Sequence, residues 1–234
     1  MGRLTLWETL QSAFSAKTWA IVTPAIGETL YMVLCTTILT VFFGLLLGVL
    51  LVITDRDGIH PCPRFSLVAG SVVNGFRSLP SMIVIILTLP LSRLIVGRSY
   101  GPQACIIALA VTCVPMFGRL VESSILEVSK GKIEAARSMG AQNRDIVLKV
   151  LLPEALPSLI RSFTIAIIAI ISTTALAGTL GAGGLGDVAV RFGYSRFKTD
   201  ILLAAVLVMI VIVQIVQFTG NSLSKLVLKK RHLI

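Results

Sequence analysis

Three glycines in the C-terminal third of the chain have the spacing of a phosphate-binding loop. Gly181, Gly183 and Gly186 match G-x-G-x-x-G, and Asp200 falls near the acidic position that binds a ribose in dinucleotide-binding proteins. In those proteins the pattern follows a short β-strand, whereas here it follows a long lipid-compatible helix. We therefore reject nucleotide binding and expect 178–186 to form a tight re-entrant loop that needs the conformational freedom of glycine.

No other set of residues offers catalytic or metal chemistry. The sequence G-x-x-x-x-G-K-[ST] is absent, and no nucleophile–base pair or pair of carboxylates falls in a credible site. The four cysteines and two histidines lack paired metal spacing, and Cys62 is expected to be a reduced thiol in a tight turn. We therefore expect no catalytic residue, no metal site and no cofactor bound by this chain, which then depends on another subunit for chemical energy.

The composition is that of a protein that crosses a membrane several times. Of the 234 residues, 55% are hydrophobic and 14% are charged, and the mean hydropathy is +0.92. The net charge of +10 does not indicate nucleic-acid binding, because no soluble basic domain exists to carry such a surface. Lys and Arg number twelve in 54–66, 127–161 and the tail after 223, against seven in the opposite segments, so 127–161 is predicted inside.

Long apolar runs predict an all-α protein with five transmembrane spans. The predicted spans lie at 29–53, 65–96, 103–117, 159–178 and 201–218. Residues 1–28 are expected at the extracytoplasmic interface, residues 29–225 form the transmembrane domain, and residues 226–234 form a basic cytoplasmic tail. An odd number of spans with this tail inside requires the N-terminus outside.

The second of these runs is too long for one ordinary span, and Pro80 and Pro90 interrupt it. Arginine at mid-bilayer is costly, which leaves two interpretations of Arg77. Either the arginine stays at the inner interface and the span starts near Leu79, or the arginine is buried and paired.

The longest water-compatible stretch runs from Glu134 to Pro153. Residues 132–139 predict a short helix with Gly140 as its left-handed stop. A second short helix is expected to start near Gln142, with apolar residues at helical spacing on one face, and Pro153 is expected to close it.

This spacing resembles the EAA loop of ABC-importer permeases, with Glu-Ala-Ala followed by a glycine and then Leu-Pro. The resemblance implies a cytoplasmic loop, residues 128–157, that docks into a groove of a separate ATPase. The coupling residues it implies are Glu134, Ala135, Ala136, Gly140, Ala141, Leu152 and Pro153. The Glu134 carboxylate either pairs with a basic group on the ATPase or pairs locally with Lys130 or Arg137.

Two further stretches resemble the methionine ABC-importer permeases, namely Phe76-Arg77-Ser78-Leu79-Pro80 and Gly-Ala-Gly-Gly-Leu-Gly at 181–186. This resemblance implies a type I ABC-importer permease fold in the bacterial inner membrane, in contact with membrane lipid and not with nucleic acid. It implies a homodimer, two ATPase subunits that hold ATP and Mg, and a periplasmic or lipid-anchored binding protein. The docking residues expected for that binding protein are Gly181, Gly183, Gly184, Gly186, Arg191 and Tyr194.

Small and hydroxyl side chains draw a stripe along the fourth span, at 158, 162, 166, 169, 173 and 177. The stripe either packs against neighbouring helices or lines the translocation path. The path or gate candidates near its outer end are Ser172, Thr173 and Leu176.

The expected function is that of a transport subunit and not an enzyme, with methionine as the imported solute. Two alternatives stay open at this point. One is a permease for another amino acid or an oxyanion, and the other is a membrane scaffold or sensor subunit that moves no solute.

Overall fold

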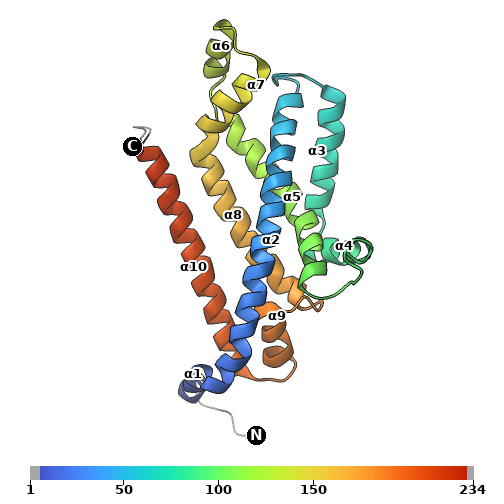
Figure 1. Ribbon diagram of the computed structural model, residues 1–234, viewed down its shortest axis with the longest axis vertical. Helices are drawn as coiled ribbons and strands as arrows, with labels where there is room; N and C mark the ends of the chain where they lie inside the picture. The colour runs from blue at the N-terminus through green and yellow to red at the C-terminus, as the bar shows by residue number, and fades with distance from the viewer. Residues whose placement is uncertain (1–5, 231–234) are drawn as a thin grey trace. The chain divides into compact units, whose positions relative to one another are not determined.

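The computed structural model describes residues 6–230, so part of the predicted N-terminal segment and the end of the basic tail, with Arg231, lie outside the described residues. Figure 1 labels its helices, which include two short π-helical segments, η1 and η2. They are α1 (Leu6–Ala13), α2 (Ala16–Thr54), α3 (Pro63–Ser78), α4 (Ser81–Val96), α5 (Pro102–Leu126), α6 (Lys130–Ser138), α7 (Asn143–Asp145), η1 (Ile146–Leu151), α8 (Leu152–Gly178), α9 (Gly184–Val188), η2 (Ala189–Tyr194) and α10 (Thr199–Lys230). The described residues form no β-strand, and the prediction of an all-α protein is confirmed.

Four helical segments of the described chain are long and apolar enough to cross a membrane. They are α2, α5, the continuous run Asn143–Gly178 that ends in α8, and α10. The bent pair α3 and α4 passes the same test together with a bend of 110°, so the number is five if the pair counts as one span, which agrees with the five predicted. The break falls at Leu79, whose extended ψ of 141° is the conformation that a following proline imposes. Arg77 lies in the last turn of α3 and is exposed on this chain, and both interpretations of it stay predictions.

The chain divides into two compact units. The first consists of Met1–Ile38, Pro80–Val111 and Ile167–Val216. Its core contains Ala13, Val22, Ala25, Leu185, Val188, Ile201, Ala204 and Ala205. Val22 and Ala25 are buried there, and α2 begins at Ala16, thirteen residues before the predicted start of the first span at Thr29.

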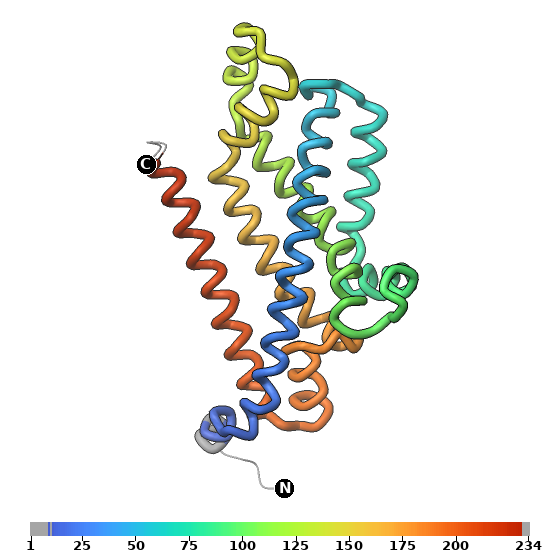
Figure 2. The backbone as a smooth tube through the Cα atoms, viewed as in Figure 1, coloured from blue at the N-terminus to red at the C-terminus, as the bar shows by residue number. Residues whose placement is uncertain are grey.

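The second unit consists of Leu39–Leu79, Thr112–Ala166 and Gln217–Ile234. Within it, Figure 2 shows the end of α2 and the whole of α3 running antiparallel on either side of a short loop. Its core contains Val52, Ile59, Phe117, Val121, Ile125, Ala136, Ile146, Leu151, Ala155 and Ala166. A Cβ at Gly48 would lie 2.5 Å from the Gly118 carbonyl oxygen, so α2 and α5 approach closely at this residue.

The predicted end of a helix at Pro153 is wrong, because α7, η1 and α8 follow one another without a break. In the π-helix η1 the Leu152 N–H donates to the Val147 carbonyl oxygen, five residues back. Pro153, which has no N–H, comes directly after this change of hydrogen-bond register. A proline in the first turn after such a change costs far less than one in a regular helix interior.

We predict that Gly48→Ala lowers the free energy of unfolding by about 1–3 kcal/mol, because the new methyl group meets backbone and the Val121 side chain. Gly27→Ala in the same helix is the matched control, since no atom lies within 4 Å of a Cβ there. The control is neutral or slightly stabilising. Thermal unfolding of both variants in detergent measures the difference, and equal losses would contradict the close approach.

Candidate functional site

The stretch with the EAA-like spacing folds into an elbow, which we define as residues 129–151. At the end of α6 the Gly140 N–H donates to the Arg137 carbonyl oxygen at 2.9 Å, and the Ala141 N–H donates to the Ala136 carbonyl oxygen at 3.1 Å. Gly140 has a φ of 82°. These bonds and this φ form a Schellman motif, in which glycine adopts the left-handed conformation without a steric penalty. The predicted glycine stop is confirmed.

The two alanines of the Glu-Ala-Ala sequence lie on different faces of α6. Ala136 is 5% exposed and packs in the core of the second unit with Ile59. Ala135 and Glu134 are exposed, and Met139 is 82% exposed. The half-buried coupling candidates are Ala141, Leu152 and Pro153. Internal packing explains the small side chain at 136, whereas Ala135 and Met139 form an exposed edge that we call the elbow edge.

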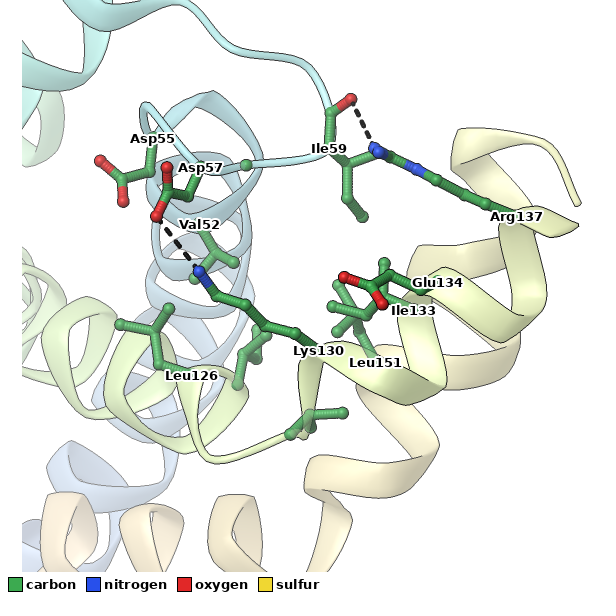
Figure 3. A pocket seen from close by; sticks show the side chains of 13 residues that line it. Val52, Asp55, Asp57, Ile59, Leu126, Lys130, Ile133, Glu134, Arg137 and Leu151 are labelled. Carbon is green, nitrogen blue, oxygen red and sulfur yellow. Dashed lines mark hydrogen bonds and ion pairs between the residues drawn. The ribbon is translucent and has the colours of Figure 1, made fainter.

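The loop between α2 and α3 is attached to the elbow, as Figure 3 shows. Lys130 Nζ lies 3.1 Å from Asp57 Oδ2, and Arg137 Nη2 donates a hydrogen bond of 3.3 Å to the Ile59 carbonyl oxygen. These side chains surround a pocket of about 220 Å³ whose remaining wall is largely apolar.

Apolar packing holds this loop more firmly than its ion pair does. The Lys130 and Asp57 side chains are 75% and 78% exposed, and such surface pairs contribute at most about 1 kcal/mol. The buried Ile59 side chain contributes about 1.5–3 kcal/mol through removal of its surface from water. The elbow and the loop therefore share one apolar core.

Local pairing of Glu134 with Lys130 or Arg137 is wrong, because both basic residues have other partners. Within residues 6–230 the Glu134 carboxylate makes no ion pair. Lys132, on the same helix, pairs with Glu154 in the first turn of α8 at 2.7 Å. Glu134 lines the same pocket as Lys130 and Arg137 without an ion pair to either of them.

The small-residue stripe of α8 turns toward the interior of both units. In the second unit the Ser162 hydroxyl lies 2.8 Å from that of Ser124 on α5. In the first unit Thr173 is 9% exposed and its hydroxyl donates to a carbonyl oxygen of its own helix. This arrangement favours the packing interpretation of the stripe. Ser172 and Leu176 are exposed beside it, and their role in a path stays a prediction.

The glycine-rich loop closes on a carboxylate that the sequence analysis missed. The Gly184 N–H donates to Glu28 Oε2 at 2.7 Å, and the Leu185 N–H donates to Thr29 Oγ1 at 2.8 Å. Gly183 and Gly184 have φ values of 84° and 77°, which favour glycine. A polar pair at the start of an apolar run was the only sequence signal for Glu28 and Thr29.

The predicted docking residues divide into two groups. Gly184 and Gly186 are buried, Gly183 is half-buried, and all three serve the packing of this loop. Gly181 and Arg191 are exposed, and Tyr194 is 76% exposed. Arg191 is held by an ion pair of 2.7 Å to Asp187. The exposed group stays a prediction for binding-protein contact.

Comparisons with known proteins agree with the resemblance drawn from the sequence. Residues 58–231 match the family described as binding-protein-dependent transport system inner membrane component. The chain is 42% identical over 199 residues to a probable D-methionine transport system permease protein of Vibrio cholerae, covering 85% of this chain and 88% of the relative. It is 40% identical over 181 residues to the methionine import system permease protein of Bacillus subtilis, covering 77% and 82%.

A solved structure of the MetNI methionine ABC transporter in inward-facing conformations has a chain with a TM-score of 0.89 and 36% identity to this chain. The match covers 92% of this chain and 99% of the solved one. Proteins of this kind are permease subunits, and ATP hydrolysis lies in a separate subunit. The chain thus belongs to the family of binding-protein-dependent inner-membrane transport components, in the group that contains the methionine ABC-importer permeases.

Proposed function

We propose that this chain is the permease subunit of an ATP-driven methionine importer. Two copies form the translocation path, and two ATPase subunits, which hold ATP and Mg, bind at the elbow. A binding protein delivers the solute on the opposite face. The observation that carries this proposal is the elbow edge, the exposed surface of α6 with Ala135 and Met139, since Ala136 on another face of the same helix is packed into the core.

The elbow is suited to transmit movement because its attachments lead directly into longer helices. The Lys132–Glu154 pair and the continuous run from α7 into α8 connect it to one helix, and the Ile59 loop connects it to α2 and α3. A displacement of α6 by an ATPase therefore reaches these helices without an intervening flexible linker. The N-terminus lies outside and the C-terminus lies inside in this proposal.

Uptake by the reconstituted transporter tests the proposed function. We expect the chain, assembled with its ATPase and binding protein in proteoliposomes, to accumulate labelled methionine only with ATP. ATPase activity should rise when methionine-loaded binding protein is added. Uptake of a different solute would favour the alternative permease, and tight ATPase binding without any uptake would favour a scaffold or sensor subunit.

Docking at the elbow edge predicts that Ala135→Trp lowers methionine uptake at least about tenfold, because a bulky side chain there holds two surfaces apart. The yield and melting temperature of the chain should stay unchanged, since Ala135 is exposed. The matched control is Ala16→Trp, at an exposed alanine at the start of α2. Ala136→Trp is a poor test, because it disrupts the core and so lowers the yield itself. Undiminished uptake by Ala135→Trp would refute docking at this edge.

The orientation of the elbow is testable with a native cysteine. Cys62 is a free, exposed thiol in the loop attached to the elbow, while Cys105 and Cys113 are buried. A membrane-impermeant maleimide should label the chain in inside-out vesicles and not in intact spheroplasts, and Cys62→Ser should abolish that labelling. Labelling of Cys62 in intact spheroplasts would place the elbow on the wrong side for an ATPase.

A further inference from the structure

A second polar pocket lies in the second unit, between the end of α3 and the C-terminal half of α5. Its volume is about 450 Å³, within the range of about 300–1,000 Å³ that is typical of small-molecule sites. Its wall combines two guanidinium groups, one carboxylate, one hydroxyl and apolar side chains, supplied by Arg77, Arg119, Glu122, Ser123, Met116 and Leu120. The mixture of both charges with apolar surface distinguishes this pocket from a purely structural packing defect.

Arg119 holds the carboxylate of the pocket in a defined position. Its Nη1 lies 2.6 Å from Glu122 Oε2, and its Nη2 donates to the Gly70 carbonyl oxygen on α3 at 3.0 Å. The Arg119 and Glu122 side chains are only 22% and 19% exposed. Arg119 is therefore a positioning residue, and Glu122 keeps its second oxygen as an acceptor.

Arg77 is the unpaired cation of the pocket. It is exposed and makes no ion pair within residues 6–230. With Arg119 and Glu122 neutralising each other, the pocket has one guanidinium in excess. A guanidinium binds a carboxylate through two parallel hydrogen bonds.

Arg77 lies among exposed side chains of α3 that are partly apolar. Asn74 is exposed one turn before it, but Leu67, on the same side as Asn74, is 70% exposed, and Val72 and Phe76 are exposed on another side. In membrane proteins, charged side chains within the helices face water-filled cavities or the bundle interior and avoid lipid. The charge of Arg77 therefore fits a water-filled surface better than a lipid-facing one.

We propose that this pocket binds a zwitterionic α-amino acid with an apolar side chain during its passage through the protein. Arg77 binds the carboxylate, and Glu122 accepts hydrogen bonds from the ammonium group. Met116 and Leu120 contact the apolar side chain, for which a thioether is well suited because sulfur is polarisable. The inference rests on the proposed function, since only a permease brings free solute to this surface.

An anionic lipid headgroup fits the pocket less well. A phosphate beside Arg77 would also lie close to the Glu122 carboxylate, and the two negative charges would repel each other. A zwitterion satisfies both charges of the pocket at once. The two ligands therefore differ in their need for Glu122.

Direct binding tests the proposal on the full chain, together with the ATPase that co-purifies, in phosphatidylcholine nanodiscs. We expect saturable binding of labelled L-methionine that norleucine displaces, whereas methionine methyl ester and N-acetylmethionine do not. Arg77→Gln and Glu122→Gln should each weaken binding at least about tenfold, because each removes a charge-assisted contact. Arg64→Gln, at an exposed arginine of the same helix, is the matched control and should bind normally.

Selectivity separates loss of the site from loss of folding. Arg77→Gln should no longer distinguish methionine from its methyl ester, Glu122→Gln should no longer distinguish it from N-acetylmethionine, and Arg77→Lys should retain part of the affinity. A misfolded chain cannot show such matched changes. Binding that neither glutamine variant alters, or that phosphatidylglycerol alone displaces, overturns the proposal.

Uptake measurements distinguish failure of the site from failure of the proposed function. Normal methionine uptake by Arg77→Gln and Glu122→Gln would contradict the proposed binding site and leave the proposed methionine importer supported. Retained binding of norleucine and leucine without any methionine uptake would support the site and remove methionine as the solute.

Discussion

Helices in apolar surroundings have no water to satisfy their polar side chains, and this condition governs where the polar groups of the chain lie. Several hydroxyl groups within the helices donate to carbonyl oxygens of their own helix, as Thr88 does to Val84 and Thr164 does to Ile160. Such residues are compatible with both lipid and close helix packing. Charges cannot satisfy themselves in this way, and the ion pairs of residues 6–230 lie at the elbow, at the loop around α9 and in the pocket of Arg119.

The elbow combines two requirements that usually conflict. It must expose a surface to a partner, and it must be attached rigidly enough to move helices. The first requirement is met by the edge with Ala135 and Met139, and the second by burial of Ala136 and Ile59 in one core. Since apolar burial outweighs the exposed Lys130–Asp57 pair, the attachment is expected to depend little on salt.

In the loop around α9, polar side chains also find their hydrogen-bond partners within the chain. The backbone N–H groups at the start of a helix have no partners within that helix. Here Glu28 and Thr29 accept two of them from residues 156 positions further along the chain. Glycines at 183 and 184 allow the backbone to approach these side chains, which accounts for glycines that otherwise suggest a nucleotide site.

Local properties of the sequence determined much of this protein. Apolar run length predicts the spans, and the freedom of glycine predicts the stop at Gly140. Proline chemistry predicts the break at Pro80, but the expected interruption at Pro90 is wrong, because α4 continues through it. Each of these depends on neighbouring residues only. Contacts between distant residues decided the rest: the inward turn of Ala136, the partners of Lys130, and the meeting of Arg77 with Arg119 and Glu122 in one pocket. Helical periodicity allows several faces to point inward, and only the packed neighbours select among them.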